Sequence, residues 1–384
     1  IPDPLWSRGL GDVYKRQGYI EGYYGRLFSQ DERAKVINHM GKLKMDFYLY
    51  GPKEDLYHRV QWRKPYPVEE QKTLRNLVAQ CKKNKIRPIF ALSPGLQSAK
   101  SSNNYKKDLI SKMMQAQKLG FKEFAIFFDD IEHEQNEDLA KSHLKIINSV
   151  SSIKGLKKNP LMVCPTVYCK SFAKGDIKNN KYLKVLAREI DPSISILWTG
   201  DEVVSQSIPQ KGIKELRSLF LNPIVIWDNY YANDYCPSRF YIGPYKGRKS
   251  LDSLTEAIGI NPTGMPFTDM ICLSRFMGEE IDRQIIDNFD IPHEFIKVLP
   301  YFSDPFKNLP SLSLGGIDKL LKTQYKLCIE WKGDLQLEWA PFLWKFYLDL
   351  ILLKKIKTGD SQFNLEQWLN RRYSDPLKKT ILRN

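Results

Sequence analysis

Short apolar or aromatic runs recur along the first 276 residues and alternate with longer amphipathic stretches. Runs of this length are typical of buried strands, and apolar residues at helical spacing are typical of the helices that cover them. The pattern predicts strands at residues 19–24, 45–50, 87–92, 123–128, 161–165, 193–198, 223–227 and 270–273. Between them it predicts helices at residues 30–43, 68–83, 105–119, 139–150 and 182–189.

This alternation of strands and helices predicts a parallel sheet with right-handed crossovers. Eight strands within roughly 260 residues match the size of a closed barrel. A doubly wound open sheet is the alternative, but no GxGxxG segment follows any of the runs. We therefore expect an α/β protein built on a (β/α)8 TIM-type barrel.

The pattern changes after residue 276, where longer helices are predicted at residues 315–332, 335–357 and 363–373. We expect a barrel domain over residues 18–276 and a helical C-terminal domain over residues 277–384. Residues 1–17 show neither periodicity, and their GLGDVYKRQ end resembles the translated adapter tails of some assembled environmental sequences. We expect this segment to be a non-native or disordered tail.

The composition and charge of the chain restrict the classes of function that it can have. The formal charge is +15, but the lysines are scattered and no zinc-finger, RNA-recognition or helix-turn-helix pattern accompanies them. We therefore interpret the charge as solvated surface and expect no nucleic-acid partner. The most apolar stretch, residues 335–353, is interrupted by Glu338, Pro341, Lys345 and Asp349, which argues against a membrane span.

Cysteine and histidine spacing indicates neither a metal nor a disulfide framework. The six cysteines contain no CxxC pair, and the five histidines form no metal-spaced cluster. We expect no cofactor. With no secretory signal in the sequence, this cysteine usage fits a reducing compartment, and we expect a cytoplasmic location.

Candidate chemistry lies where the predicted strands end, since barrel active sites are at the C-terminal ends of the strands. Asp129 and Asp130 directly follow one apolar run. Two adjacent carboxylates do not both ionise easily, so one pKa is expected to rise, which would leave the acid and the anion that glycoside hydrolysis uses. A helix N-cap is the alternative explanation for this pair.

Other strand ends supply polar and aromatic candidates, each with a plainer reading. Lys53 could bind a substrate hydroxyl or be a surface lysine, and Tyr168, Trp198 and Trp227 could wall a sugar ring or be core. Asn229 and Asp234 are suited to forming hydrogen bonds with sugar hydroxyls. Cys164 has no histidine nearby in sequence, so a structural cysteine is favoured.

These residues lie in segments that resemble glycoside hydrolase family 84, the O-GlcNAcases and related hyaluronidase-like N-acetylglucosaminidases. Ten motifs match in order over residues 18–276. They are EGYYGR (21–26), KMDFYLYGPKEDLYHR (44–59), WRKPYP (62–67), ALSPGL (91–96), FAIFFDDI (124–131), CPTVYC (164–169), LWTGDEVV (197–204), IWDNYYANDY (226–235), IGPYKGR (242–248) and INP (260–262).

The resemblance implies a retaining β-N-acetylglucosaminidase in which the sugar's own 2-acetamido oxygen attacks the anomeric carbon to form an oxazoline. Asp129 would polarise the acetamido group, and Asp130 would act as general acid and then general base. The resemblance places Gly22, Lys53, Asn229, Asp234 and Asn261 on the sugar hydroxyls and N-acetyl group. It places Cys164, Tyr168 and Trp227 in the N-acetyl pocket and Val203 beside the leaving group.

The sequence departs from the family where Asp201 and Glu202 stand in place of a frequent proline, which leaves the aglycone open. The expected substrate is a glycoprotein or other glycoconjugate bearing O-linked or terminal β-GlcNAc. The alternatives are a hexosaminidase for free glycans or cell-wall fragments and an inactive glycan-binding protein. The oligomeric state is open, with a homodimer through the C-terminal helices as the candidate.

Overall fold

Strand pairing closes a barrel in the computed structural model, which describes residues 16–96, 104–131, 134–153, 160–278, 283–307, 309, 311–359 and 365–370. Within these residues, eight parallel strands pair in chain order and the last pairs with the first. They are β1 (Gln17–Glu21), β2 (Phe47–Tyr50), β3 (Arg87–Leu92), β4 (Glu123–Phe127), β5 (Leu161–Cys164), β6 (Ser195–Trp198), β7 (Ile224–Asp228) and β8 (Ala257–Ile260). The predicted (β/α)8 barrel is therefore confirmed, and the open sheet is wrong.

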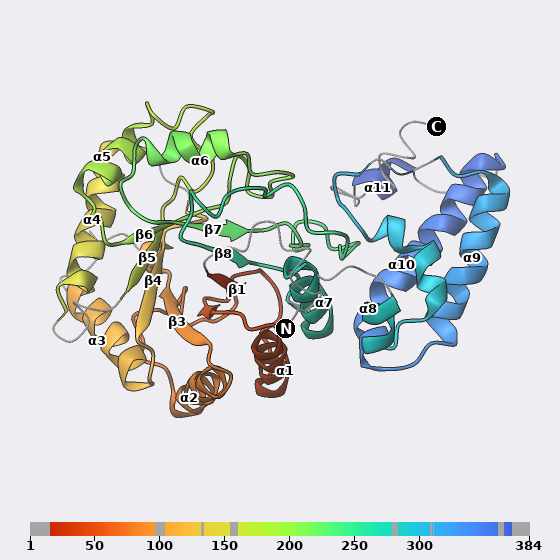
Figure 1. Cartoon of the computed structure of the whole chain (residues 1–384), viewed down its shortest axis with the longest axis horizontal. Helices are drawn as coiled ribbons and strands as arrows, with labels where there is room; N and C mark the ends of the chain where they lie inside the picture. Colours follow the sequence, from red (N-terminus) through yellow and green to blue (C-terminus); the bar gives the residue numbers. More distant parts are fainter. Residues whose placement is uncertain are drawn as a thin grey trace, which may run out of the picture. The chain divides into compact units, whose positions relative to one another are not determined.

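Helices connect the first seven strands and surround the barrel (Figure 1). They are α1 (Gln30–Lys42), α2 (Val68–Lys83), α3 (Tyr105–Lys118), α4 (Glu137–Ser151), α5 (Lys181–Glu189) and α6 (Gln210–Arg217), with a 3₁₀ turn at Pro94–Leu96. Local sequence sets their starts: Ser29 and Glu32 form a capping box on α1, and Asn136 and Asn180 cap α4 and α5.

The last predicted strand is wrong. Residues 270–273 lie inside helix α7 (Pro266–Phe276), whose side chains are buried on nearly every side. A short apolar run in such a helix has no polar face, so its periodicity cannot be distinguished from that of a strand. The true strand β8 carries Gly259 at its centre, which weakened its apolar signal.

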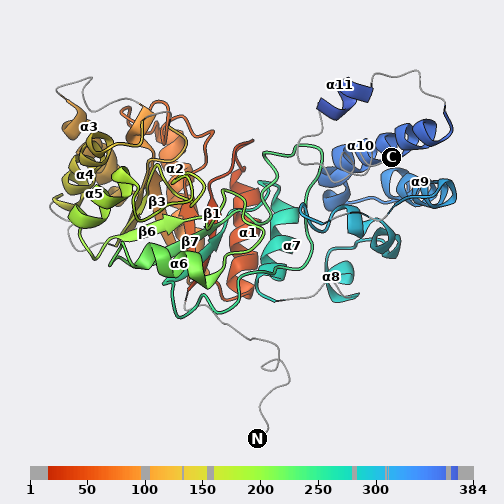
Figure 2. The same cartoon turned by 90° about the horizontal axis from the view of Figure 1, so that it is seen from above.

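The chain divides into two compact units, and the second combines Tyr231–Tyr245 with Met265–Asn384. The second unit contains α7, α8 (Arg283–Asn288), α9 (Leu314–Ile329), α10 (Asp334–Lys357) and α11 (Leu365–Asn370), with 3₁₀ turns at His293–Lys297 and Leu299–Tyr301. Helices α9 and α10 lie side by side (Figure 2). A buried ion pair between Arg239 and Asp349, 2.9 Å long, ties the Tyr231–Tyr245 segment to α10.

The second unit thus includes two segments that the sequence pattern assigned to the barrel domain. They are residues 231–245 and 265–276. The proposed domain division at residue 276 stays a prediction. Of the expected tail, residues 1–17, the first fifteen lie outside the described part, whereas Gln17 already belongs to β1. The predicted last helix is described only over Leu365–Asn370.

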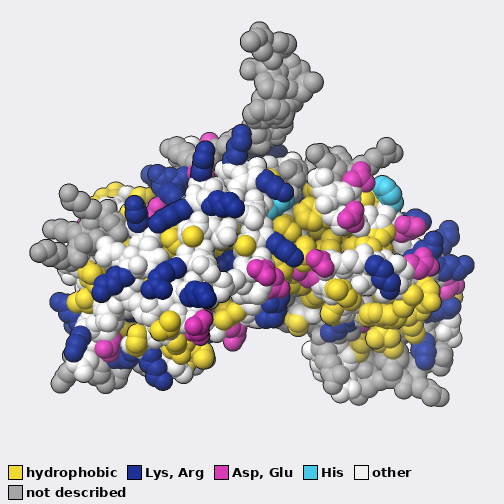
Figure 3. All heavy atoms as spheres, turned by 90° about the horizontal axis from the view of Figure 1, so that it is seen from below, with side chains coloured by type: hydrophobic (Ala, Val, Ile, Leu, Met, Phe, Trp, Pro, Cys, Tyr) yellow, Lys and Arg dark blue, Asp and Glu magenta, His cyan; other side chains and the backbone are white. Residues whose placement is uncertain are grey.

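Surface charge is dispersed on the face shown in Figure 3, where Lys and Arg side chains are spread among other residues. Among the described residues, no helix is both long and apolar enough to cross a membrane. All six cysteines lie in this part of the chain, and they are buried thiols outside any disulfide.

Candidate active site

The candidate residues of the barrel follow the C-terminal ends of its strands. Because parallel strands of a barrel all end at one rim, side chains far apart in sequence can meet there. Gly22 follows β1, Lys53 follows β2, the aspartate pair follows β4, Asn229 follows β7 and Asn261 follows β8.

Lys53 lies against both candidate carboxylates. Its ammonium group forms an ion pair with Oδ2 of Asp129 and lies 3.7 Å from Oδ2 of Asp130. The side chains of Lys53 and Asp129 are 2% and 7% exposed, so water screens this contact little. One buried cation therefore serves two carboxyl groups.

The backbone at Asp130 explains how neighbouring carboxylates reach the same cation. Successive side chains of an extended strand point to opposite faces. Asp130 instead has φ of 52°, the left-handed conformation that Asp tolerates better than most residues. The chain turns there immediately after the strand. The N-cap explanation of the pair is wrong, because Asn136 caps the following helix.

Two tyrosines hold the carboxylate of Asp130. The hydroxyl of Tyr24 donates to Oδ2 at 2.8 Å, and the hydroxyl of Tyr168 donates to Oδ1 at 2.9 Å. Arg59 donates to the Tyr24 oxygen at 3.2 Å. The two oxygens of Asp130 are thus held by different loops, one after β1 and one after β5. Tyr24 was not singled out from the sequence, although its place two residues after Gly22 at a strand end was the available signal.

The electrostatics of Asp130 differ from the expectation for two isolated carboxylates. Burial alone would raise its pKa, but the charge of Lys53 and the hydrogen bonds from Tyr24 and Tyr168 lower the pKa below the usual value. A raised pKa is therefore wrong for Asp130 in the unliganded site. The sequence argument counted the like charge of the neighbour and could not include the cation.

A chain of hydrogen bonds joins four strand ends. The Gly22 N–H donates to Oδ1 of Asn261 at 3.2 Å, and Nδ2 of Asn261 donates to Oδ1 of Asn229 at 2.9 Å. The indole N–H of Trp227 donates to the same Asn229 oxygen at 2.9 Å, and Nδ2 of Asn229 donates to the Val203 carbonyl at 2.8 Å. Five predicted site residues are thus connected directly.

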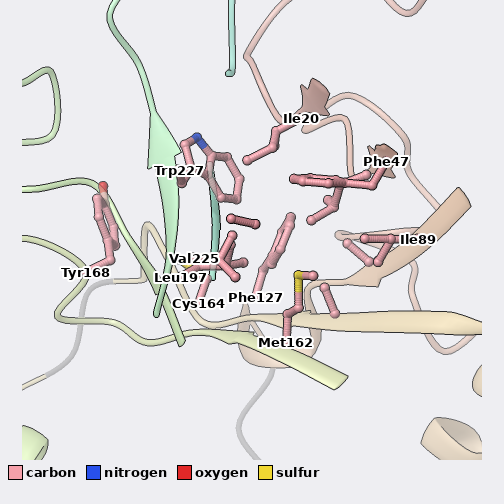
Figure 4. Close-up of a cluster of buried hydrophobic side chains, with 14 of the residues drawn as sticks. Ile20, Phe47, Ile89, Phe127, Met162, Cys164, Tyr168, Leu197, Val225 and Trp227 are labelled. Atoms are coloured by element: carbon pink, nitrogen blue, oxygen red, sulfur yellow. The ribbon is translucent and has the colours of Figure 1, made fainter. Parts of the chain in front are cut away.

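Apolar side chains pack beneath this chain. Trp227 and Phe127 lie with ring centroids 5.0 Å apart, and Cys164 and Tyr168 belong to the same buried cluster. Figure 4 shows the strand side chains of this cluster pointing toward one another, with Tyr168 to one side. Val203 is partly buried against the cluster. Burial raises the pKa of the Cys164 thiol, which keeps it protonated and fits a wall residue better than a nucleophile.

The loop that carries Lys53 is itself held by buried polar groups. Asp55 accepts hydrogen bonds from the hydroxyls of Tyr50 and Tyr66 at 2.7 and 2.8 Å. His58 is fully buried, lies 2.9 Å from the Ala91 carbonyl, and has its pKa lowered to about 4, mainly by burial. These supports were not predicted, because nothing in the sequence distinguishes them from other polar loop residues.

Asp234 belongs to the second unit, so its proposed part in sugar binding stays a prediction. It is exposed, and its carboxylate accepts the Tyr235 N–H at 3.0 Å. Trp198, the remaining aromatic candidate, is a fully buried strand residue and fits the core reading. In the described part of the chain, no three His, Cys, Asp or Glu side chains are grouped as metal ligands.

Gly22 tests the tightness of this site. A β-carbon there would lie 2.4 Å from the Trp227 ring, so the ring would have to move away from Asn229. We expect Gly22→Ala to lower the free energy of unfolding by about 1–3 kcal/mol, the usual cost of overpacking, in urea denaturation followed by circular dichroism. Gly95→Ala is the control, because its β-carbon would meet only ordinary contacts from 3.4 Å outward. Equal losses in both variants would contradict this packing.

Comparison with known proteins assigns the chain to a family. The family model described as beta-N-acetylglucosaminidase matches residues 17–278. The protein O-GlcNAcases of Mus musculus and Rattus norvegicus are each 35% identical over 240 residues, which is 61% of this chain and 26% of theirs. The chain therefore spans about a quarter of the length of these relatives. The resemblance to glycoside hydrolase family 84 is confirmed, and the chain belongs to the beta-N-acetylglucosaminidase family of glycoside hydrolases.

Proposed function

We propose that this chain is a retaining β-N-acetylglucosaminidase that uses the 2-acetamido group of its substrate as the nucleophile. The observation that carries the proposal is the environment of the Oδ1 atom of Asp129. Its Oδ1 atom is buried and accepts no hydrogen bond from any described residue, whereas Oδ2 is paired with Lys53. A buried carboxylate oxygen without a donor is costly, and the acetamido N–H of a bound sugar would satisfy it.

In the proposed first step, the acetamido oxygen attacks the anomeric carbon and the bond to the aglycone oxygen breaks. Asp129 accepts a hydrogen bond from the acetamido N–H, which strengthens the attacking oxygen, and takes up that proton as the ring closes. Asp130 gives its proton to the leaving oxygen, and an oxazoline forms. In the second step, water gives a proton to Asp130 and attacks the same carbon, the bond from this carbon to the oxazoline oxygen breaks, and Asp129 returns its proton to the nitrogen. Two inversions at one carbon retain the configuration.

Asp130 must be protonated to begin this cycle, although its pKa is lowered in the unliganded site. Its side chain is 31% exposed, so a bound sugar would cover it and remove water. Such burial disfavours the charged form and raises the pKa. We infer that substrate binding itself prepares the acid, while Lys53 stays paired with Asp129.

The remaining site residues are assigned by the same proposal. Gly22, Lys53, Asn229, Asp234 and Asn261 would bind the sugar hydroxyls and the N-acetyl group. Cys164, Tyr168 and Trp227 would wall the N-acetyl pocket, and Val203 would face the leaving group. The burial of the three wall residues, each 6% exposed or less, supports a small apolar pocket for a methyl group.

We propose O-linked or terminal β-GlcNAc on glycoconjugates as the substrate, supported by the relatives named as protein O-GlcNAcases. Free glycans and cell-wall fragments remain the alternative, because their GlcNAc would need the same pocket. The carboxylate pair and its paired lysine argue against a purely glycan-binding role. We expect no nucleic-acid partner and no cofactor.

The candidate homodimer would use the C-terminal helices. Leu337, Trp344 and Leu348 are 71%, 38% and 55% exposed and recur at helical spacing along α10. Exposed apolar residues on one helix face favour association. We also propose a cytoplasmic location, which the six buried thiols support.

Turnover of a chromogenic β-GlcNAc glycoside, beside its GalNAc and glucose analogues, tests the proposed activity. We expect hydrolysis of the GlcNAc compound and essentially none of the glucose compound, which has no acetamido nucleophile. Release of the chromophore is followed between pH 5 and 8. Absence of GlcNAc hydrolysis across this range would overturn the proposed function.

Asparagine variants separate the roles of the two aspartates. Asp130→Asn removes the proton donor, so substrates with poor leaving groups should lose roughly 10²–10⁴-fold in rate, the usual range for general acid catalysis. Activated phenols need little protonation and should keep much of their first-step rate. Added azide should restore turnover, since it attacks the oxazoline without a base.

Asp129→Asn should behave differently because it weakens the nucleophile. Good and poor leaving groups should both slow, and azide should not help. Each variant is the matched control for the other, since both make the same chemical change at adjacent positions. The same leaving-group dependence in both variants, or exchanged behaviour, would show that the roles are misassigned.

A further inference from the structure

The left-handed turn at Asp130 needs support from outside its own loop. Its φ of 52° is a conformation that costs free energy in a residue other than glycine, and it persists where the surroundings impose it. The residue two positions earlier, Phe128, is where the barrel ladder ends and the turn begins. The contacts that hold the backbone of Phe128 therefore also set the direction in which the aspartate pair leaves the strand.

Phe128 is held through both of its backbone polar groups. Its N–H donates to the Cys164 carbonyl at 2.8 Å, which continues the pairing of β4 with β5. Its carbonyl accepts the hydroxyl of Thr166 at 2.8 Å, a buried hydrogen bond between residues 38 positions apart. Thr166 thus takes the place of the next rung of the ladder, at the point where the backbone turns away.

Thr166 is held in turn. Its N–H donates to the hydroxyl of Tyr182 at 3.2 Å, and that oxygen lies 3.0 Å from Nδ1 of His143. The imidazole of His143 stacks on the Phe128 ring with centroids 3.8 Å apart and planes 5° from parallel. Helices α4 and α5 therefore reach Phe128 by two routes, through the ring stack and through the Thr166 hydroxyl.

All four side chains are buried and none is among the groups that contact the aspartate carboxylates. The Thr166 hydroxyl satisfies the buried carbonyl of Phe128, and an apolar residue of the same shape at position 166 would leave that carbonyl without this donor. The network ends on the single carbonyl that precedes Asp129. Its geometry points to the backbone of the aspartate pair as the feature that it maintains.

We propose that Thr166, whose backbone N–H is held by Tyr182, is a positioning residue whose hydroxyl orients the Phe128 carbonyl and so keeps both aspartates turned toward Lys53. The inference rests on the proposed function for its catalytic consequence, but its geometric claim is independent of the substrate.

The test compares three variants of the whole chain. Thr166→Val keeps the shape and removes the hydroxyl, and Thr166→Ser keeps the hydroxyl. Thr255→Val is the matched control, because the Thr255 hydroxyl is also buried and also donates to a backbone carbonyl, that of Leu251 at 2.9 Å, away from the aspartates. All three are measured for unfolding in urea and for kcat and KM with the chromogenic β-GlcNAc glycoside.

We expect Thr166→Val to lower kcat by roughly 10- to 100-fold with a small change in KM, because misplacing reacting groups by an ångström or less has effects of this size. Thr166→Ser should keep most of kcat. Thr255→Val should leave kcat unchanged, and the Leu251 carbonyl still accepts the N–H groups of Leu254 and Thr255 in that variant. Equal kcat in Thr166→Val and Thr255→Val, per folded molecule, would reduce Thr166 to a stabilising role and overturn the proposal.

A second readout needs no activity. The carboxyl pKa of Asp130, followed by carbon-13 NMR titration, should rise in Thr166→Val and stay in place in Thr166→Ser, because the misplaced carboxylate loses the charge of Lys53. An inactive wild type that shows this difference would reject the proposed function and support the positioning claim. An unmoved Asp130 pKa in Thr166→Val would reject the positioning claim whatever the activity.

Discussion

Lys53 places a buried positive charge against two carboxyl groups that are neighbours in the chain. Without it, two adjacent carboxylates at the mouth of a barrel would repel, and one would take up a proton. With it, both approach one ammonium, and Asp130 is held ionised with the help of two tyrosine hydroxyls. The arrangement leaves Oδ1 of Asp129 buried without a hydrogen-bond donor among the described residues.

Most of the surrounding structure can be understood as maintaining this contact. Asp55 and His58 hold the loop after β2 that presents the lysine. Phe128 and the left-handed turn after β4 present the carboxylates. The hydrogen bonds from Gly22 to Val203 join β1, β8, β7 and the loop after β6 into one rim, and Trp227 of this rim belongs to the buried apolar cluster. Each of these loops is held by its own buried contacts, and the barrel strands fix the positions of the loops relative to one another.

The barrel could be predicted from sequence because short apolar runs alternate regularly with amphipathic helices, and helix α2 was located to the residue. The eighth strand could not be predicted in this way. A buried helix and a buried strand can each present a short apolar run, and the true strand contains a glycine. Strand ends led to the aspartate pair, Lys53 and Asn229. Tyr24 and Thr166 were missed as functional candidates because their importance comes from partners 106 and 38 positions away. The lowered pKa of Asp130 depends on Lys53, a loop residue whose approach no spacing rule predicts.

The central claim is that Asp129 works through the substrate's acetamido group rather than attacking the sugar itself. Stepwise fluorination of the N-acetyl group of a chromogenic β-GlcNAc glycoside tests it directly, because each fluorine withdraws electron density from the attacking oxygen while the leaving group stays the same. The account predicts a progressive fall in kcat from the acetyl to the monofluoro-, difluoro- and trifluoroacetyl compounds. A kcat that is indifferent to fluorination would contradict it and point to a nucleophile supplied by the protein.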